Sequence, residues 1–233
     1  MEIVFILVKP AVPENVGAAA RAIKTMGFCQ LRLVNPCEYN NDKARMLAHG
    51  SHDILEQAVC YQTLTDAMFD IDFSIATSAK SRAVRLNYIS SDELADYLIR
   101  KGNTISKIAI VFGCEESGLD NDELRMCDMV SYVPIANKYP SLNLAQAVMV
   151  YSYSLSKLIL SKKPINKEFQ TDNSIQALKN KANQLLHIGG IDKDNTIYGR
   201  IMERLMLIDG EDVNLLHSIT SKLLKKFNYE KQV

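Results

Sequence analysis

The sequence predicts an α/β protein built on a mostly parallel sheet and followed by a small all-α extension. Apolar runs rich in β-branched residues alternate with helical patterns through residues 1–160, as in parallel strands that are joined by helices. After Pro164 and the polar stretch NKEFQTDNS no strand pattern recurs, and helical apolar spacing follows at 174–188, 195–207 and 211–227. We therefore expect an α/β domain over residues 1–162 and a helical extension over 163–233.

Five apolar runs are the predicted strands. The first, IVFILV at 3–8, is apolar without interruption, which is typical of a strand covered on both faces. The others are LRLVNP (31–36), FSIATSA (73–79), IAIVFG (108–113) and MVSYVPI (129–135).

Helical patterns separate these runs. The first helix is expected to begin at Pro13 and Glu14, with Asn15 as its N-cap, and to stop at Gly27. The next patterns are DKARMLAHGSHDILEQA (42–58), SSDELADYLIRK (90–101), the short NDELRMC (121–127) and a long apolar helix over 141–160.

The composition is that of an ordinary soluble protein. Of the 233 residues 47% are hydrophobic and 23% charged, and no apolar run approaches the roughly 20 residues of a membrane span. The start MEIVFILVKP lacks the basic leader of a signal peptide, and the five cysteines form no CxxC pair. We expect reduced thiols, a cytoplasmic location and no membrane contact.

Two histidines raise the question of a metal site. His49 and His52 stand three residues apart, but neither cysteines nor paired carboxylates accompany them. We interpret them as surface or capping residues and expect no bound metal.

Charge is unevenly distributed along a chain whose net charge is zero. Residues 1–155 carry 14 basic and 18 acidic side chains, and residues 156–233 carry 13 and 9. A zero net charge argues against a nucleic-acid partner, whereas the basic excess in the extension favours a polyanion contacted through that part.

A nucleotide-dependent metabolic enzyme on an ordinary dinucleotide-binding fold is disfavoured, because the fingerprint of that fold is missing. The turn after the first strand reads KPAVPENVGAAAR, with one glycine instead of G-x-G-x-x-G, and the second strand ends in VNP without an acidic residue.

Four polar segments lie at or just beyond strand ends, where open α/β sheets bind their ligands. They are ENVGAAAR, TSAKSR (77–82), FGCEESGL (112–119) and YPSLNLAQA (139–147). Each also has a plain structural interpretation: a capped helix, an ordinary turn, a capping box of Asp120 with Glu123, and a proline-started helix with Ser141 as cap. The last of these leaves Asn143 without a role.

Taken together, three of these segments resemble the motifs of a known family. N-x-G-x-x-x-R (Asn15, Gly17, Arg21), F-G-x-E-x-x-G-L (112–119) and S-L-N-L-A (141–145) are similar, in order and spacing, to the three motifs of SpoU-type, TrmH-class RNA ribose methyltransferases of the SPOUT superfamily. The helical extension looks more like the TrmJ and LasT-type branch than like a bare catalytic domain.

The resemblance implies a fold, a reaction and partners. The fold is a SPOUT-type sheet whose C-terminal part forms a trefoil knot, and the reaction is S-adenosyl-L-methionine-dependent 2′-O-ribose methylation of tRNA or rRNA, with tRNA favoured. The extension would contact the RNA, and the apolar face of AVMVYSYSLSKLI would serve a homodimer. By position, the cofactor-binding residues would be Thr77, Ser78, Ala79, Gly113, Val133, Ile135, Pro140, Ser141 and Leu142.

The resemblance also implies roles for five catalytic residues. In the family the corresponding arginine lies next to the target ribose and is often described as the base. A guanidinium stays protonated at neutral pH and cannot accept a proton, so we interpret Arg21 as holding the adjacent phosphate and stabilising negative charge on the attacking oxygen. Asn15 would orient Arg21 and the ribose, Glu115 would fix the loop or Arg21, and Ser141 and Asn143 would donate or accept hydrogen bonds.

One residue departs from the family pattern. The position after Gly113 is commonly arginine or asparagine in the relatives, and here it is Cys114. This departure gives some support to an alternative in which the chain is a catalytically silent RNA-binding protein on the same fold. The complete motifs oppose that alternative.

Overall fold

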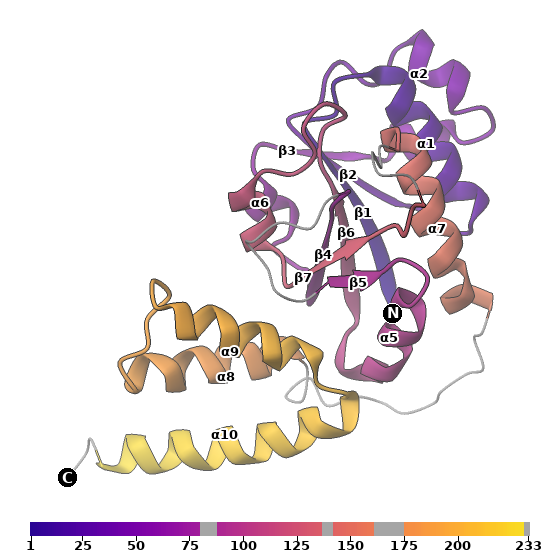
Figure 1. The fold of residues 1–233 in the computed structure, drawn as a ribbon. Coiled ribbons are helices and arrows are strands. Elements are labelled where there is room, and N and C mark those ends of the chain that lie inside the picture. Colours follow the sequence, from indigo (N-terminus) through magenta and orange to yellow (C-terminus); the bar gives the residue numbers. More distant parts are fainter. Residues whose placement is uncertain (80–87, 137–141, 161–174, 231–233) are drawn as a thin grey trace.

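A seven-stranded sheet forms the centre of the molecule (Figure 1). In the computed structural model, residues 1–79, 88–136, 142–160 and 175–230 are described. The strand order is β3-β2-β1-β6-β4-β7-β5, and every neighbouring pair is parallel. The predicted parallel α/β architecture is therefore confirmed. The strands are β1 (Glu2–Val8), β2 (Gln30–Val34), β3 (Val59–Tyr61), β4 (Phe73–Thr77), β5 (Tyr88–Ser90), β6 (Lys107–Phe112) and β7 (Met129–Tyr132).

The central strands are buried on both faces, as their uninterrupted apolar runs predict. In β1 and β6, Phe5 pairs with Ile110 and Ile6 with Val111, and all four side chains are fully buried. The two edge strands, β3 and β5, have three residues each and were not predicted. A run of three residues is too short to show a period, so only pairing with the neighbouring strand reveals it.

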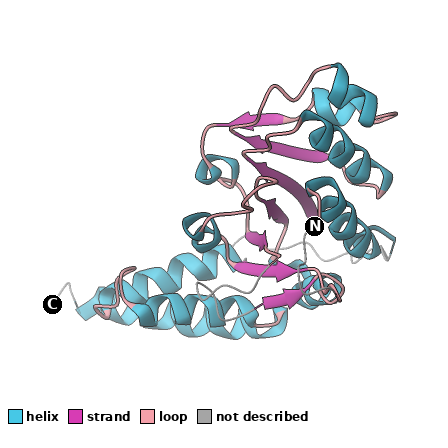
Figure 2. Ribbon diagram, turned by 45° about the horizontal axis from the view of Figure 1, so that its top comes forward, coloured by secondary structure: helices cyan, strands magenta, loops and turns pink. Residues whose placement is uncertain are grey.

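Helices cover both faces of the sheet (Figure 2). One face packs against α1 (Pro13–Thr25), α3 (His52–Glu56), α5 (Leu94–Lys101) and α7 (Leu144–Leu160), with α2 (Asp42–Leu47) beside α1. The other face packs against α4 (Leu64–Ala67) and α6 (Asn121–Met126). No helix within the described ranges has the length and apolar character that a membrane crossing requires.

Two local predictions were wrong. The single helix expected over 42–58 is broken into α2 and α3, because Gly50 adopts a left-handed conformation with φ 74° between them. Asn15 does not cap α1: the N-cap is Val12, and Pro13 is the first helical residue. Gly27, with φ 86°, does end this helix as expected.

The C-terminal helices agree closely with their predicted spans. They are α8 (Ile175–Ile188), α9 (Thr196–Leu207) and α10 (Gly210–Glu230). Their buried residues Ile175, Leu178, Met206 and Val213 belong to the same hydrophobic core as the sheet. These helices therefore pack against the α/β part of the chain.

A buried lysine anchors the end of α9. Lys101 is completely buried, and its Nζ donates hydrogen bonds to the main-chain carbonyls of Met206 and Ile208. The Tyr97 hydroxyl also donates to the Met206 carbonyl. Burial lowers the pKa of Lys101 to about 8.

A second anchor holds α8 beside the start of β7. Asp128 Oδ1 accepts a hydrogen bond of 2.7 Å from Lys179 Nζ, and Oδ2 accepts two from the main-chain N–H and hydroxyl of Ser74. The Lys179 and Asp128 side chains are only 18% and 14% exposed. Both anchors lie near the amino ends of the strands.

Candidate active site

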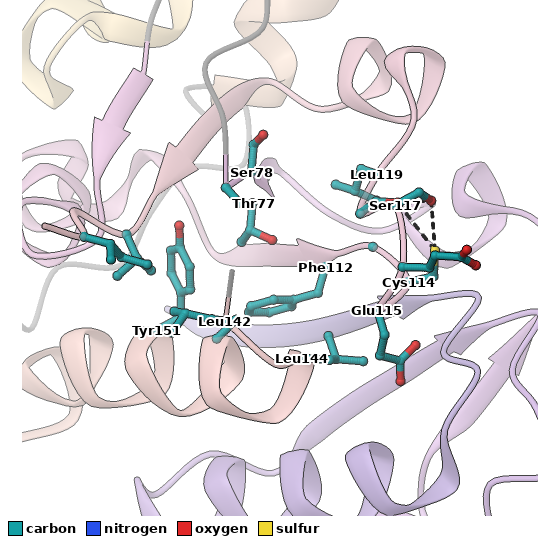
Figure 3. Close-up of a pocket in the computed structure, with 17 residues that line it drawn as sticks. Thr77, Ser78, Phe112, Cys114, Glu115, Ser117, Leu119, Leu142, Leu144 and Tyr151 are labelled. Carbon is teal, nitrogen blue, oxygen red and sulfur yellow. Dashed lines mark hydrogen bonds between the residues drawn. The ribbon is translucent and has the colours of Figure 1, made fainter. Parts of the chain in front are cut away.

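A cavity of about 300 Å³ lies at the carboxyl ends of β4, β6 and β7 (Figure 3). Ligands of open parallel sheets bind at this edge. The cavity is lined by Thr77, Ser78 and Ala79 at the end of β4; by residues 112–119 at the end of β6 and beyond; by Val133 and Ile135 after β7; and by Leu142, Leu144, Ala147 and Tyr151 around the start of α7.

The loop after β6 turns back tightly on itself at Gly113. A Cβ at this position would lie 2.0 Å from the main-chain carbon of Gly118 and 2.1 Å from the Leu119 nitrogen. The Gly118 N–H donates to the Cys114 carbonyl at 2.9 Å, which closes the turn. Only glycine fits at position 113, so this residue fixes the shape of one cavity wall.

Glu115 fastens this loop to the start of α1. Its Oε2 accepts a hydrogen bond of 2.9 Å from the Ala11 N–H, and its Oε1 accepts one of 3.3 Å from the Val12 N–H and one of 2.9 Å from Asn15 Nδ2. Burial opposes ionisation of this carboxyl, but the three donors outweigh burial and lower its pKa. Glu115 is therefore a carboxylate that holds two segments together.

Asn15 and Asn143 extend the contact to the start of α7. Asn143 Nδ2 donates to Asn15 Oδ1 at 2.8 Å, and Asn15 Nδ2 donates in turn to Glu115 Oε1. One residue from each of the three sequence motifs thus enters a single line of hydrogen bonds. We call Glu115, Asn15 and Asn143 the motif line.

Asn143 has a structural role that the sequence did not indicate. Its Oδ1 accepts from the Ala145 N–H at 2.8 Å, and its own N–H donates to Gln146 Oε1 at 3.0 Å. These contacts cap α7. The interpretation in which capping leaves Asn143 without a role was wrong, because this residue both caps the helix and bonds Asn15.

Most of the predicted cofactor residues line this one cavity. Thr77, Ser78, Ala79, Gly113, Val133, Ile135 and Leu142 all do so. The predicted residues Pro140 and Ser141 lie outside the described residues. The Thr77 hydroxyl donates to the Val111 carbonyl at 3.0 Å, so its position is fixed by the sheet.

Arg21 lies apart from the cavity within its own chain. It is exposed on α1 and has no hydrogen bond or ion pair with any residue that the structure describes. The neighbouring Gly17 is buried against α2, where a Cβ would come within 2.0 Å of the Ala44 carbonyl oxygen. The predicted contacts of Asn15 and Glu115 with Arg21 are not made in this chain.

Sequence reasoning missed the apolar wall of the cavity. Tyr151, from the second turn of α7, packs edge-on against Phe112 with ring centroids 5.5 Å apart. Its hydroxyl donates to Ser131 Oγ at 3.0 Å. Figure 3 shows both rings between the strand ends and α7. The available signal was an aromatic residue inside a helix that follows a motif directly.

The sequence-based prediction also missed the role of Lys9, which directly follows β1. The Lys9 Nζ donates to Glu123 Oε1 at 2.8 Å, and the side chain of this glutamate also completes the predicted capping box with Asp120, which is confirmed. Lys9 has a left-handed φ of 51°. The β1–α1 connection is therefore tied to the loop of residues 113–119 through Glu115 and to the following helix α6 through Glu123.

Cys114 does not supply the polar group that it replaces. Its Sγ lies 3.1 Å from Ser117 Oγ, and this contact lowers the pKa of the thiol.

Of the two histidines considered above as metal ligands, His52 contacts the Arg45 carbonyl through Nε2 at 2.9 Å. The described part of the chain contains no group of three histidine, cysteine or acidic side chains that could hold a metal ion.

Comparison with known proteins identifies the family. Residues 2–153 match the model of the SpoU rRNA Methylase family, and residues 172–227 match that of the tRNA/rRNA methyltransferase LasT C-terminal domain. The uncharacterized tRNA/rRNA methyltransferase LasT of Escherichia coli (strain K12) is 41% identical over 97% of this chain and 98% of its own length.

Two further relatives cover nearly the whole chain. The tRNA (cytidine/uridine/adenosine-2′-O-)-methyltransferase TrmJ of Pseudomonas aeruginosa is 30% identical over 97% of this chain and 96% of its own. A solved structure of a probable methylase family protein from Haemophilus influenzae Rd KW20 is similar with a TM-score of 0.66, at 31% identity and over 98% of both chains. This chain belongs to the SpoU rRNA methylase family, and its C-terminal helices are those of the LasT type.

Proposed function

We propose that this protein transfers the methyl group of S-adenosyl-L-methionine to a ribose 2′-hydroxyl of tRNA. The observation that carries the proposal is the motif line, which joins all three sequence motifs beside one cavity at the ligand-binding edge of the sheet. The names of the TrmJ relatives, which are tRNA 2′-O-methyltransferases, favour tRNA over rRNA.

The cavity suits a nucleoside with a short charged tail. Its volume of about 300 Å³ falls at the lower end of the range for small-ligand sites. Apolar walls from Phe112, Leu144 and Tyr151 would pack against the adenine, and the main chain at Thr77 to Ala79 and at Gly113 would provide polar contacts. Bound there, S-adenosyl-L-methionine would supply a methyl group already activated by a positive sulfur. A trefoil knot and cofactor contacts of Pro140 and Ser141 belong to the same proposal.

The motif line would position the ribose. An amide NH₂ group has two hydrogens, and Asn15 and Asn143 each use one within the line. The second hydrogen of each remains for the sugar oxygens. Because amides are not bases and the Glu115 carboxylate has a lowered pKa, these residues would align the hydroxyl with the methyl group, and alignment itself accelerates such a transfer. As the oxygen–methyl bond forms and the methyl–sulfur bond breaks, the hydroxyl proton would pass to solvent water.

Arg21 would act on the substrate phosphate. Its guanidinium is exposed and makes no ion pair with any described residue, so it can bind the phosphate next to the target ribose without first breaking a contact. Stabilising the negative charge that develops on the attacking oxygen would be its second role.

Two other regions would serve assembly and RNA binding. The outer side of α7 exposes Met149 at 36%, Tyr153 at 68% and Leu160 at 85%, and we assign this side to a homodimer. The helical extension predicted for residues 163–233 would contact RNA, with exposed Arg200 and Arg204 as candidates for phosphate contacts.

The test is methyl transfer from labelled S-adenosyl-L-methionine to bulk tRNA and, separately, to rRNA, followed by mapping of the methylated ribose. We expect the wild-type protein to label tRNA. Asn15→Ala should reduce the rate of labelling at least 100-fold, whereas Asn180→Ala, a matched change at an exposed position of α8, should leave it unchanged. Cofactor binding and tRNA binding without any transfer would instead establish the silent RNA-binding alternative.

A further inference from the structure

Helix α10 has apolar residues on two sides. Its inner side packs against α8, with Val213 fully buried and His217 only 3% exposed. Its outer side carries Leu215, Ile219 and Leu223, which are 63%, 53% and 41% exposed. Figure 1 shows α10 as the outermost helix of the C-terminal group, with α8 and α9 on one side of it.

The three exposed residues form one stripe, because a spacing of four residues keeps side chains on the same face of a helix. A helix that serves only its own chain needs one apolar face. A second apolar stripe that faces solvent is typical of a helix that packs against another partner.

An exposed charge stands at each end of the stripe. Asp212 precedes Leu215 by three residues, and Lys226 follows Leu223 by three, so all five side chains share the outer face. Exposed Lys222 lies at the edge of this side of the helix, three residues after Ile219. Along its length the face presents Asp212, the three apolar residues and Lys226, in that order. We call these five residues the outer face of α10.

We infer that the outer face of α10 packs antiparallel against the same face of a second copy of this chain. With a two-fold axis at Ile219, Leu215 would lie opposite the partner's Leu223, and Asp212 opposite the partner's Lys226. Symmetry makes each of these contacts twice. A parallel arrangement would place like charges opposite each other at both ends, which is unfavourable.

The same face is poorly suited to RNA. The apolar stripe offers phosphates no hydrogen-bond donor, and Asp212 would repel them. The contact uses α10 and not α7, so it is distinct from the homodimer assigned above and does not rest on the proposed activity. A failure of this inference would leave cofactor binding and methyl transfer as they are.

A disulfide placed on the two-fold axis tests the contact in the full chain. Ile219→Cys should give a disulfide-linked dimer under mild oxidation, at a yield several times that of Asn214→Cys, which lies on α10 but off the outer face. The wild-type chain sets the background, because its cysteines Cys29 and Cys60 are exposed. Equal yields from the two variants would overturn the inference.

A charge exchange in the Ile219→Cys chain tests the arrangement. Asp212→Lys alone, or Lys226→Asp alone, would place like charges opposite each other twice, and the yield should fall at least fivefold. The double exchange should restore the yield to within twofold. If Lys226→Asp instead weakens binding of bulk tRNA and the double exchange restores neither property, the face binds RNA and the inference is wrong.

Discussion

The two ends of the central sheet use polar side chains in opposite ways. At the carboxyl end, Glu115, Asn15 and Asn143 form a line beside a cavity, and each of the two amides has one hydrogen without an acceptor among the residues that the structure describes. At the amino end, Lys101 is buried and Asp128 is largely covered beneath the C-terminal helices, with acceptors for the Lys101 ammonium and donors to the Asp128 carboxylate.

The difference shows how one fold separates binding from stability. A buried charged group whose hydrogen-bonding capacity is taken up has nothing left to offer a ligand, and removing one of its partners destabilises the fold. A rigid polar group with hydrogen-bonding capacity to spare can be completed by a substrate. Substitutions at the carboxyl end should therefore change binding and catalysis, and substitutions at the amino end should change stability.

Among substitutions that test this division, Gly113→Ala at the carboxyl end should have the largest effect on ligand binding. The new Cβ would meet main-chain atoms of Gly118 and Leu119 at about 2 Å, so the loop must open and the cavity wall must move. We expect at least a 100-fold loss of S-adenosyl-L-methionine affinity, measured by calorimetry. The control is Gly199→Ala on α9, where no atom lies within 4 Å of the added Cβ. If Gly113→Ala binds the cofactor normally, the loop does not form the site.

Glu115→Gln should have the next largest effect. The carboxylate accepts three hydrogen bonds, and an amide NH₂ in place of one oxygen would face the N–H groups of Ala11 or of Val12 and Asn15. We expect a 10- to 100-fold loss of kcat with a far smaller change in cofactor affinity. The matched control is Glu38→Gln, at an exposed glutamate that does not line the cavity. Equal activity of the two variants would remove the motif line from the mechanism.

Asp128→Asn tests the amino end. The new amide would leave Lys179 without its anion and would face the Ser74 donors, so the free energy of unfolding should fall by about 3 kcal/mol. Cofactor affinity of the folded protein should not change. Lys24→Met, which breaks an exposed ion pair with Asp53, should cost less than about 1 kcal/mol. A loss of cofactor binding in Asp128→Asn at full stability would contradict the division between the two ends.

Much of the fold followed from local sequence, because a buried parallel strand and an amphipathic helix each have a pattern that is visible within one segment. The edge strands β3 and β5 did not follow, since three residues become a strand only through their neighbours β2 and β7. The break between α2 and α3 depended on a single left-handed glycine, Gly50.

The site could be predicted to a similar extent. The motifs and their strand-end positions predicted which segments meet, and Glu115, Asn15 and Asn143 do meet. The sequence did not show which side chains would contact each other. Arg21 lies apart from the cavity, and Lys9 binds Glu123 across 114 residues of sequence. Such distances are set by packing, which a single sequence does not show.

The smallest effect concerns Lys101, and it is visible chiefly in its pH dependence. Its pKa falls from 10.5 to about 8 on burial, so between these values the unfolded chain holds a proton that the folded chain has lost. The free energy of unfolding should therefore rise with pH across this window, by up to about 1.4 kcal/mol per pH unit from this group.

Lys101→Met should remove that rise. At pH 7 two effects oppose each other in this variant: the Ile208 carbonyl loses its donor, which costs about 1 kcal/mol, and the chain no longer buries a charge. The measurement is urea unfolding of both proteins from pH 7 to pH 10, read as a difference so that other lysines cancel. The control is Lys43→Met, an exposed lysine, which should keep the wild-type slope. A slope that persists in Lys101→Met would mean that this lysine keeps its proton throughout, held by the two carbonyls at the end of α9.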